Sequence, residues 1–484
     1  MALVAYLLFL GVPVGIYSLF GRELPGILVV VHYVVATAYS LTAALMLVEA
    51  AMALPRRNAP IAAKEARPQV PLTSVIVSAY LPNEQDVIVG TIMHLATEMH
   101  VPSYNLQIVL AYNSPEGLPV EDALRSLDGL AANFTALPVA GSHSKAENIV
   151  ATLPLCRGEM TVLLDADHHP LPDAFERAYR WLLRGYDVVQ GRCVVRNQQE
   201  NLQTRYLSVE FEQMYAVAHS GRSLATDNAI FAGANGYWRT AVLREIGMNA
   251  AMLTEDIDAS VRGMLAGYRF IHDRSIVSSE LATVTLRSWW HQRIRWAQGW
   301  LQVTLQHQAA IWRSPHLGLK NKVLWTYLLS WRELFTFLSL QVFALIAASL
   351  LLGQPIPWFG NAYFAATTVF TVASGPVVAL SAYSVALWRT KRDLRLWFVI
   401  YACTSLIYIT AKNTAAMVAM LRQLLGEREW VVTKRGVKTV TGPAASTPAA
   451  ETAAPYARGS TTERQSVQGS GESARPPLRF PGRG

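Results

Sequence analysis

Two carboxylates followed by two histidines stand directly after an apolar run, within the segment Leu163–Pro170. The run Met160–Leu164 has the composition of a buried strand, and alternate residues of an extended strand point to the same side. Asp165 and Asp167 can therefore face one hard cation, and His168 can join them from the turn. A divalent metal held by few carboxylates keeps coordination sites free for phosphate oxygens. Two acids at a strand end are often only solvated, but this context favours a metal–diphosphate site.

A second acidic pair, Glu255 and Asp256, follows about ninety residues later. One interpretation is structural, because residues 256–265 have the pattern of a helix that these acids would cap. The other is a general base: a sugar hydroxyl has a pKa far above 7, so its attack on an activated sugar needs a nearby carboxylate. Desolvation beside a membrane would raise the pKa of that carboxylate and make it a stronger base.

The segment Gln292–Trp296 is the third constellation. On a helix, Gln292, Arg295 and Trp296 share one face, at positions i, i+3 and i+4. Arg295 can stabilise a departing diphosphate, and the flat apolar surface of Trp296 can stack on a sugar ring. Taken alone, such a face is more often an anchor in the membrane interface.

Two further segments have weaker signals. Phe231–Gly236 is rich in small residues, so a substrate can approach its backbone closely at Gly233, although a plain turn explains the composition nearly as well. Ser144–Asn148 contains Lys145, which can reach a phosphate, although a lone lysine is usually only a surface residue.

The composition of the chain indicates a membrane protein. Its 484 residues are 52% hydrophobic and only 16% charged, which is too apolar for an ordinary soluble enzyme. The formal charge of +8 comes mostly from residues beside apolar segments and in the tail, so it indicates topology and anionic lipid contact and not nucleic acid. The three cysteines, Cys156, Cys193 and Cys403, show no paired or metal-type spacing and are expected to be free thiols.

The elements that position these residues are expected between residues 70 and 285. Short apolar runs alternate there with helix-like segments, a pattern that predicts an α/β, Rossmann-like, mainly parallel sheet covered by helices on both faces. Ligands of such sheets bind beyond the carboxyl ends of the strands. The polar clusters Tyr80–Glu84, Tyr112–Ser114 and Asp165–His168 fall at three such ends. The segment contains no glycine-rich dinucleotide loop and no phosphate-loop lysine motif.

The rest of the chain is predicted to be membrane-associated or unstructured. The predicted units are two transmembrane helices (1–54), a basic linker (55–69), the α/β domain (70–285), interfacial tryptophan-rich helices (286–331), about three transmembrane segments (332–421), a basic segment (422–440) and a disordered tail (441–484). The basic linker predicts that the α/β domain is cytoplasmic.

The charges after the last apolar segment conflict with five crossings. Five crossings put the C-terminus outside, yet the basic segment 422–440 indicates that the tail begins inside. Either one late segment re-enters without crossing, or the charge rule fails here. Lys412 and Asn413 make the last segment the suspect.

The motifs in order resemble one protein family. Its signature is seen in Tyr80–Glu84, Lys145–Asn148, Asp165–His168, Thr254–Asp256 and Gln292-x-x-Arg295-Trp296. This order is similar to that of the processive family 2 glycosyltransferases, which include cellulose, hyaluronan, chitin and poly-N-acetylglucosamine synthases. The resemblance covers about residues 70–300 and implies a GT-A fold, a UDP-sugar donor, Mg²⁺ or Mn²⁺, inversion at the anomeric carbon and extrusion of a polymer.

The resemblance also implies roles for individual residues. The metal ligands would be Asp165, Asp167 and His168. The residues that contact UDP would be Tyr80, Glu84, Asn113, Lys145, Asp165, Gln292 and Arg295. The residues that contact the acceptor would be Trp296 and Gly233, and Asp256 would be the catalytic base with Glu255 beside it. One departure is Asn113, since the family usually has an aspartate there that contacts uracil.

We therefore expect a processive, inverting hexosyltransferase that polymerises a β-linked polysaccharide from a UDP-sugar, with UDP-glucose favoured, and extrudes it across the plasma membrane. The alternatives are a poly-N-acetylglucosamine or hyaluronan-type synthase, or a non-processive transferase to a lipid acceptor. The expected partners are the donor, the growing polysaccharide, the lipid bilayer and accessory or homo-oligomeric subunits, without nucleic acid.

Overall fold

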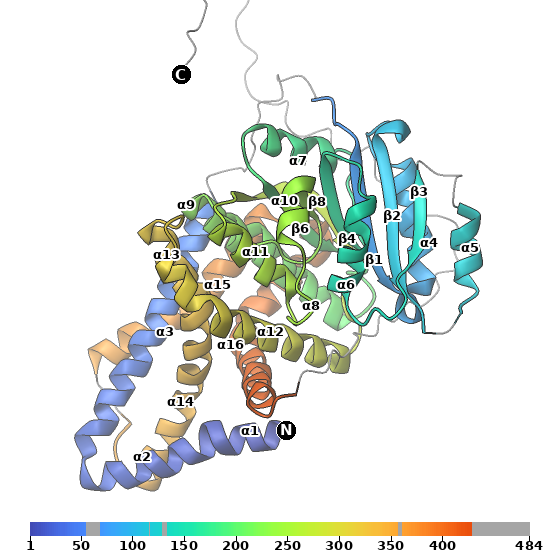
Figure 1. The fold of residues 1–484 in the computed structure, drawn as a ribbon. Helices are drawn as coiled ribbons and strands as arrows, with labels where there is room; N and C mark the ends of the chain where they lie inside the picture. Colours follow the sequence, from blue (N-terminus) through green and yellow to red (C-terminus); the bar gives the residue numbers. More distant parts are fainter. Residues whose placement is uncertain (55–67, 116, 128–132, 357–360, 428–484) are drawn as a thin grey trace, which may run out of the picture. The chain divides into compact units, whose positions relative to one another are not determined.

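The computed structural model describes residues 1–54, 68–115, 117–127, 133–356 and 361–427 (Figure 1). Most of the predicted linker 55–69, most of the basic segment 422–440 and the whole predicted tail 441–484 lie outside the described residues.

An eight-stranded sheet forms the centre of the described chain, with the strand order β3-β2-β1-β4-β7-β6-β8-β5. The strands are β1 (Thr73–Tyr80), β2 (Leu106–Asn113), β3 (Phe134–Pro138), β4 (Met160–Asp165), β5 (His169–Pro170), β6 (Val188–Val195), β7 (Gly236–Arg239) and β8 (Phe270–Glu280). The pairs β1–β2, β1–β4, β2–β3 and β6–β8 are parallel, while β4–β7, β6–β7 and β5–β8 are antiparallel. The sheet is therefore mixed and mostly parallel, as predicted.

The register brings the predicted polar clusters to one edge of the sheet. Ser78 pairs with Asp165, and Tyr80 pairs with Asn113. The apolar runs that predicted β1, β2 and β4 are buried almost throughout, because each strand is covered on both faces. Their carboxyl ends consequently open side by side.

Helices cover both faces of the sheet. They are α4 (Leu81–Thr97), η2 (Ser103–Asn105), α5 (Val120–Leu127), α6 (Lys145–Thr152), η3 (Leu153–Leu155), α7 (Ala174–Leu183), α8 (Leu202–Phe211), η4 (Glu212–His219), α9 (Ser220–Thr226), α10 (Thr240–Ile246), α11 (Glu255–Leu265) and α12 (Leu286–Arg313). Because side chains alternate along a strand, Val75 and Val77 of β1 pack in the core with α4 and α7, whereas Ile76 packs in the core with α6, α10 and α11.

The remaining helices are mostly apolar, and consecutive short ones continue into longer spans. They are α1 (Ala2–Tyr6), η1 (Leu7–Gly11), α2 (Val12–Glu23), α3 (Pro25–Ala53), α13 (Leu319–Thr326), η5 (Tyr327–Trp331), α14 (Arg332–Leu351), α15 (Ala362–Val385) and α16 (Trp388–Leu424). Together they give five candidate membrane spans, Ala2–Glu23, Gly26–Ala53, Leu319–Leu351, Ala362–Val385 and Trp388–Leu424. Their length and hydropathy indicate a membrane protein. The third span begins at Leu319, whereas the sequence placed its start after residue 331.

Both ends of α16 contact residues that flank the sheet. Near its start, Gln198 Nε2 donates a hydrogen bond to Asp393 Oδ2 at 3.1 Å, and Gln198 follows β6. Near its end, Gln302 Nε2 of α12 donates to Gln423 Oε1 at 3.2 Å. Residues near both ends of α16 therefore lie close to elements that flank the sheet.

Candidate active site

A cavity of about 530 Å³ lies at the carboxyl ends of β1, β2 and β4. Eleven of the thirteen residues that the sequence singled out line it: Tyr80, Glu84, Asn113, Lys145, Asp165, Gly233, Glu255, Asp256, Gln292, Arg295 and Trp296. The other two, Asp167 and His168, are buried immediately beyond Asp165. Segments more than two hundred residues apart in the sequence thus meet at one cavity.

Lys145 lies between the two acidic pairs. Its Nζ donates to the Asp165 carboxylate and to the Gly233 carbonyl oxygen, the latter at 2.8 Å. Burial by itself would lower the pKa of Lys145, but the charges of Asp165 and Glu255 outweigh burial and raise it. Lys145 therefore carries its positive charge into the cavity.

The start of α6 fixes the position of this lysine. Ser144 is the N-cap and accepts a hydrogen bond from the Glu147 backbone N–H at 3.2 Å. The Glu147 carboxylate returns the contact by accepting from the Ser144 N–H at 3.1 Å. This capping box satisfies free N–H groups at the helix start, so Lys145 follows at a defined position.

Asp167 and His168 are held by β8 and the residues after it. Asp167 Oδ2 accepts from the Leu281 N–H at 2.8 Å. The His168 ring has Ser278 Oγ at 3.0 Å from Nδ1 and Glu280 Oε2 at 2.7 Å from Nε2. Burial would lower the pKa of His168, but the hydrogen bond to Glu280 and the neighbouring carboxylates raise it.

The ligand atoms of Asp165, Asp167 and His168 lie within 4.8 Å of one another. Two carboxylates and an imidazole suit Mg²⁺ or Mn²⁺, and the cavity beside Asp165 leaves room for further ligands from a substrate. These three residues therefore fit a divalent cation.

The side of the cavity near β1 and β2 is lined by Tyr80, Glu84 and Asn113. The Tyr80 N–H donates to Glu84 Oε2 at 2.9 Å, so this carboxylate also stabilises the start of α4. Asn113 Oδ1 accepts from Asn148 Nδ2 at 3.2 Å, and its own Nδ2 donates to the Ser142 carbonyl oxygen at 3.1 Å. Contact of these three side chains with a nucleoside stays a prediction.

Glu255 and Asp256 occupy the first turn of α11, where the helix dipole favours negative charge. Both also line the cavity, so these two acids lie at the start of the helix and in the wall of the cavity at the same time. Burial, followed by the charge of Glu255, raises the pKa of Asp256 to about 7 against the opposing charge of Lys145. A carboxylate with such a pKa is suited to accept a proton near neutral pH.

Gly233 allows close approach at this point. Its φ is +91°, and a Cβ built on it would lie 3.1 Å from Asp256 Oδ2. A larger residue would be strained and would crowd the carboxylate. The turn interpretation and the close-approach interpretation of Phe231–Gly236 therefore both describe this segment.

Helix α12 presents Gln292, Arg295 and Trp296 to the cavity, as their spacing predicted. Arg295 Nη1 donates to the Leu253 carbonyl oxygen at 3.5 Å, close to the acidic pair. Its neighbour Arg293 is buried and donates to Glu210 Oε2 at 2.6 Å, and the Arg293 guanidinium lies 4.5 Å from the centre of the Trp296 ring.

Two contacts hold α12 against the start of α11. His307 Nε2 lies 2.7 Å from Asp258 Oδ1, which joins the two helices. Gly299 lets them approach, because a Cβ there would lie 2.8 Å from the Thr254 backbone nitrogen. The position of Arg295 relative to Asp256 therefore depends on a glycine that sequence reasoning did not single out.

Sequence reasoning also missed a buried charge network beneath α12. Glu210 of α8 accepts from Arg293, from Lys412 Nζ at 3.1 Å and from Tyr408 Oη at 2.6 Å. Lys412 is the residue that looked out of place in an apolar segment, and Glu210 explains it. In the sequence only Lys412 indicated such a network, since a lysine within an apolar segment needs a partner. The sequence does not show that the partner is Glu210.

A model of the family described as Glycosyl transferase family group 2 matches residues 160–411. Glucomannan 4-beta-mannosyltransferase 1 of Oryza sativa subsp. japonica is 26% identical over 290 residues, 57% of this chain and 51% of the relative. Glucomannan 4-beta-mannosyltransferase 2 of Arabidopsis thaliana is 32% identical over 145 residues, 29% of this chain and 27% of the relative. The chain thus spans about half the length, or less, of these relatives.

Among solved structures, the mannosyltransferase PcManGT from Pyrobaculum calidifontis, in complex with GDP-Man and Mn²⁺, is similar in fold. It has a TM-score of 0.50 and 18% identity, and the match covers 85% of this chain and 100% of that one. The likeness supports the GT-A fold, in which a divalent metal is generally used. The chain belongs to glycosyl transferase family group 2, as a cellulose synthase-like membrane protein with a GT-A fold.

Proposed function

We propose that this chain is a processive, inverting glycosyltransferase that extends a β-linked polysaccharide from a nucleotide sugar and passes it across the membrane. One observation carries the proposal. A single cavity combines Asp165, which belongs to a group of candidate cation ligands, a buried carboxylate with a pKa of about 7, and an arginine–tryptophan face on α12. Those are the parts that one displacement at an anomeric carbon needs.

In the proposed reaction, Asp256 accepts the proton of the acceptor hydroxyl as that oxygen attacks the anomeric carbon of the donor. Lys145 and Arg295 stabilise the negative charge that develops on the departing nucleotide diphosphate. Trp296 holds the terminal sugar of the acceptor. Asp165, Asp167 and His168 would hold a divalent cation, which would supply further positive charge to the diphosphate.

We propose a UDP-sugar as the donor, with UDP-glucose favoured by the resemblance of the motifs to β-glucan synthases. A second candidate is a β-linked mannan made from a mannose nucleotide. Two observations favour that candidate: the relatives above are named for mannosyl transfer, and Asn113 replaces the aspartate that usually contacts uracil.

The test is nucleotide release by the purified full chain with each donor in turn: UDP-glucose, UDP-N-acetylglucosamine, UDP-glucuronate and GDP-mannose. The product made from the radiolabelled best donor is then sized. High polymer supports processive synthesis. A one-sugar glycolipid without polymer would overturn it, and release with GDP-mannose alone would select the second candidate.

We further propose that four helices cross the membrane and that α16 does not. Gly21, near the end of the first span, and Gln354, just after the third, belong to one side, since Gln354 Nε2 donates to the Gly21 carbonyl oxygen at 2.9 Å. Both ends of α16 return to residues that flank the sheet, and Tyr6 Oη lies 2.8 Å from Thr414 Oγ1. Arg422, in the last turn of α16, then lies on the same side as the sheet, which is proposed to be the cytoplasm.

A reporter that fluoresces only in the cytoplasm, fused to the C-terminus, tests this topology. Fluorescence supports four crossings. Alkaline phosphatase activity of the matched fusion, which requires the outer side, would contradict them. Fusions after Ala53 and after Gly353 provide the inside and outside controls.

A further inference from the structure

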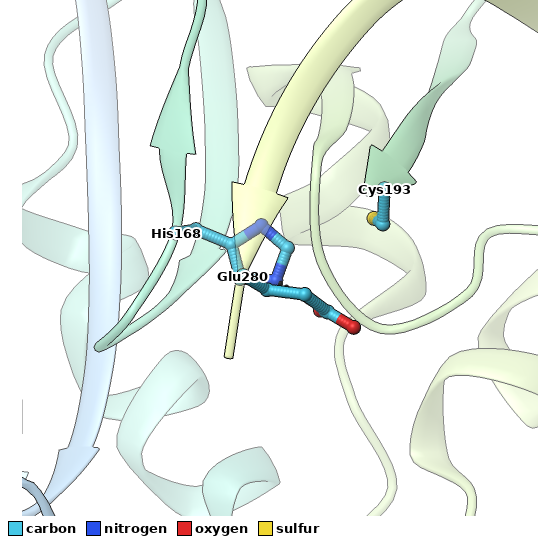
Figure 2. A group of neighbouring side chains, drawn as sticks. All are labelled: His168, Cys193 and Glu280. Carbon is cyan, nitrogen blue, oxygen red and sulfur yellow. Dashed lines mark ion pairs between the residues drawn. The ribbon is translucent and has the colours of Figure 1, made fainter. Parts of the chain in front are cut away.

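A second group of metal-type ligands lies behind the first. His168, Cys193 and Glu280 bring their ligand atoms within 4.8 Å of one another. Figure 2 shows that they come from three separate segments, the turn after β4, strand β6 and the end of β8. The function proposed above uses neither Cys193 nor Glu280.

The strand register explains why these side chains meet. Cys193 pairs with Ser278 in the parallel β6–β8 ladder, and Glu280 lies two residues after Ser278 on the same side of β8. Ser278 contacts one nitrogen of His168, while Glu280 contacts the other. The backbone therefore fixes the thiol and the carboxylate around one imidazole.

The ligand types differ from those of the first group. A thiolate, an imidazole and a carboxylate form the ligand set of Zn²⁺ and related thiophilic ions, whereas two carboxylates and an imidazole suit Mg²⁺ or Mn²⁺. A cation binds the thiolate form of cysteine, so it must displace the proton of the buried Cys193 thiol. Cys193 and Glu280 both line the cavity, which gives an ion a path to them.

We propose that His168, Cys193 and Glu280 form a second cation site, selective for thiophilic divalent ions such as Zn²⁺, Cd²⁺ and Co²⁺. Binding releases the thiol proton and separates His168 Nε2 from Glu280 Oε2, which lie 2.7 Å apart. Because the two groups share His168, an ion in the second site removes one ligand from the first. Thiophilic ions then antagonise the ion that supports donor binding, a consequence that rests on the proposed function.

Cobalt absorbance tests the site without any need for activity. Co²⁺ is titrated into the purified, metal-free full chain, and the thiolate-to-cobalt charge-transfer band is recorded. The expected result is one equivalent of bound Co²⁺ with the band, its loss in Cys193→Ser, and its retention in Cys403→Ser and Cys156→Ser. A band of wild-type intensity in Cys193→Ser, or none in the unmodified chain, would overturn the proposal.

A second variant guards against misfolding of the cysteine mutant. Glu280→Gln keeps the thiol and the shape of the side chain, so the band should persist while the apparent dissociation constant for Co²⁺ rises by at least about tenfold. An unchanged dissociation constant would remove Glu280 from the site. The unfolding temperature of each variant without metal shows whether it is folded.

Antagonism is then measured separately. Zn²⁺ should raise the Mn²⁺ concentration needed for half-maximal nucleotide binding by the unmodified chain and by Cys403→Ser, but not by Cys193→Ser. Equal antagonism in all three proteins would contradict the shared ligand. Failure of nucleotide binding altogether would count against the proposed function and would leave the cobalt result standing.

Discussion

The proposed donor half and the proposed acceptor half of the cavity are built in different ways. The proposed donor half includes Asn113, Lys145, Asp165, Asp167 and His168, which stand at strand ends or at the start of α6. The proposed acceptor half includes Glu255, Asp256 and Trp296, which stand on two helices. Backbone hydrogen bonds of the sheet fix the donor half, whereas side-chain packing between α11 and α12 fixes the acceptor half. Substitutions in the two halves should therefore have different effects on nucleotide affinity and on kcat.

Asp256→Asn should have the largest effect. Loss of the proposed base is expected to lower kcat by about 10³-fold, within the usual range for general-base catalysis, while nucleotide affinity stays near that of the unmodified chain. Initial rates and equilibrium nucleotide binding measure the two quantities separately. Asp122→Asn on exposed α5 is the matched control, and a variant rate within tenfold of wild type would remove the assignment.

Asp167→Asn should give the opposite pattern, because it changes the donor half. We expect metal-dependent nucleotide affinity to fall by roughly 10- to 100-fold, since the neutral amide is a poorer ligand. Titration calorimetry with nucleotide at saturating Mn²⁺ measures the change, again against Asp122→Asn. Unchanged affinity together with a reduced kcat would mean that Asp167 belongs functionally with the acceptor half.

These two halves were also not equally predictable. The donor half follows from apolar runs that end in polar residues, and β1, β2 and β4 each carry such a run. Strand β8 was missed because it contains buried polar residues such as His272 and Asp273, so Glu280 could not be placed beside His168. Ser220 contacts His272 and Trp181 donates to Asp273, and these partners lie 52 and 92 residues away in the sequence, where no local pattern reports them.

For the acceptor half, the sequence predicted which residues share a face but not what holds them. The spacing of Gln292, Arg295 and Trp296 was enough to predict their common face. The pairing of Glu210 with Lys412, which are 202 residues apart, was not accessible, because it depends on how α8, α12 and α16 pack. Helix packing is decided by tertiary fit, so local spacing alone cannot specify it.

Gly299→Ala tests how tightly the acceptor half depends on that packing. The new methyl group would meet the Thr254 backbone nitrogen at 2.8 Å and push α12 away from α11. We expect kcat to fall by about tenfold, because small displacements of positioned groups are costly in rate. The matched control is Gly90→Ala in α4, where a Cβ meets nothing within 4 Å. Equal effects of both variants would contradict the packing argument.

The pH dependence of the rate should report the ionisation of Asp256 in the proposed acceptor half. With the pKa of Asp256 at about 7, its charged form is scarce at pH 6, so the rate there should be about a tenth of the plateau above pH 8. Burial favours the neutral form, so this group stabilises the fold fully below its ordinary pKa, and that stability is lost as the pH rises through 7.

Asp256→Asn removes this titration. The variant should therefore unfold at a higher temperature than the unmodified chain at pH 8, and the difference should disappear as the pH falls toward 4. Rate profiles and thermal unfolding at matched pH measure both effects. A flat rate profile between pH 6 and 8 would show that Asp256 is not the group that limits the rate.

Asn113→Asp should have the smallest effect. It tests base recognition at the position where the proposed donor half departs from the family pattern. An aspartate would regain the acceptor that usually meets uracil, but it would lose the hydrogen bond that Asn113 Nδ2 donates to the Ser142 carbonyl oxygen at 3.1 Å. One hydrogen bond gained and one lost, each worth about 1 kcal/mol, should leave UDP affinity within about fivefold of wild type. The informative quantity is the ratio of UDP to GDP affinity, since only the gained contact distinguishes the bases. A ratio that rises supports uracil recognition at this position, whereas a ratio that falls would favour the mannose nucleotide as the donor.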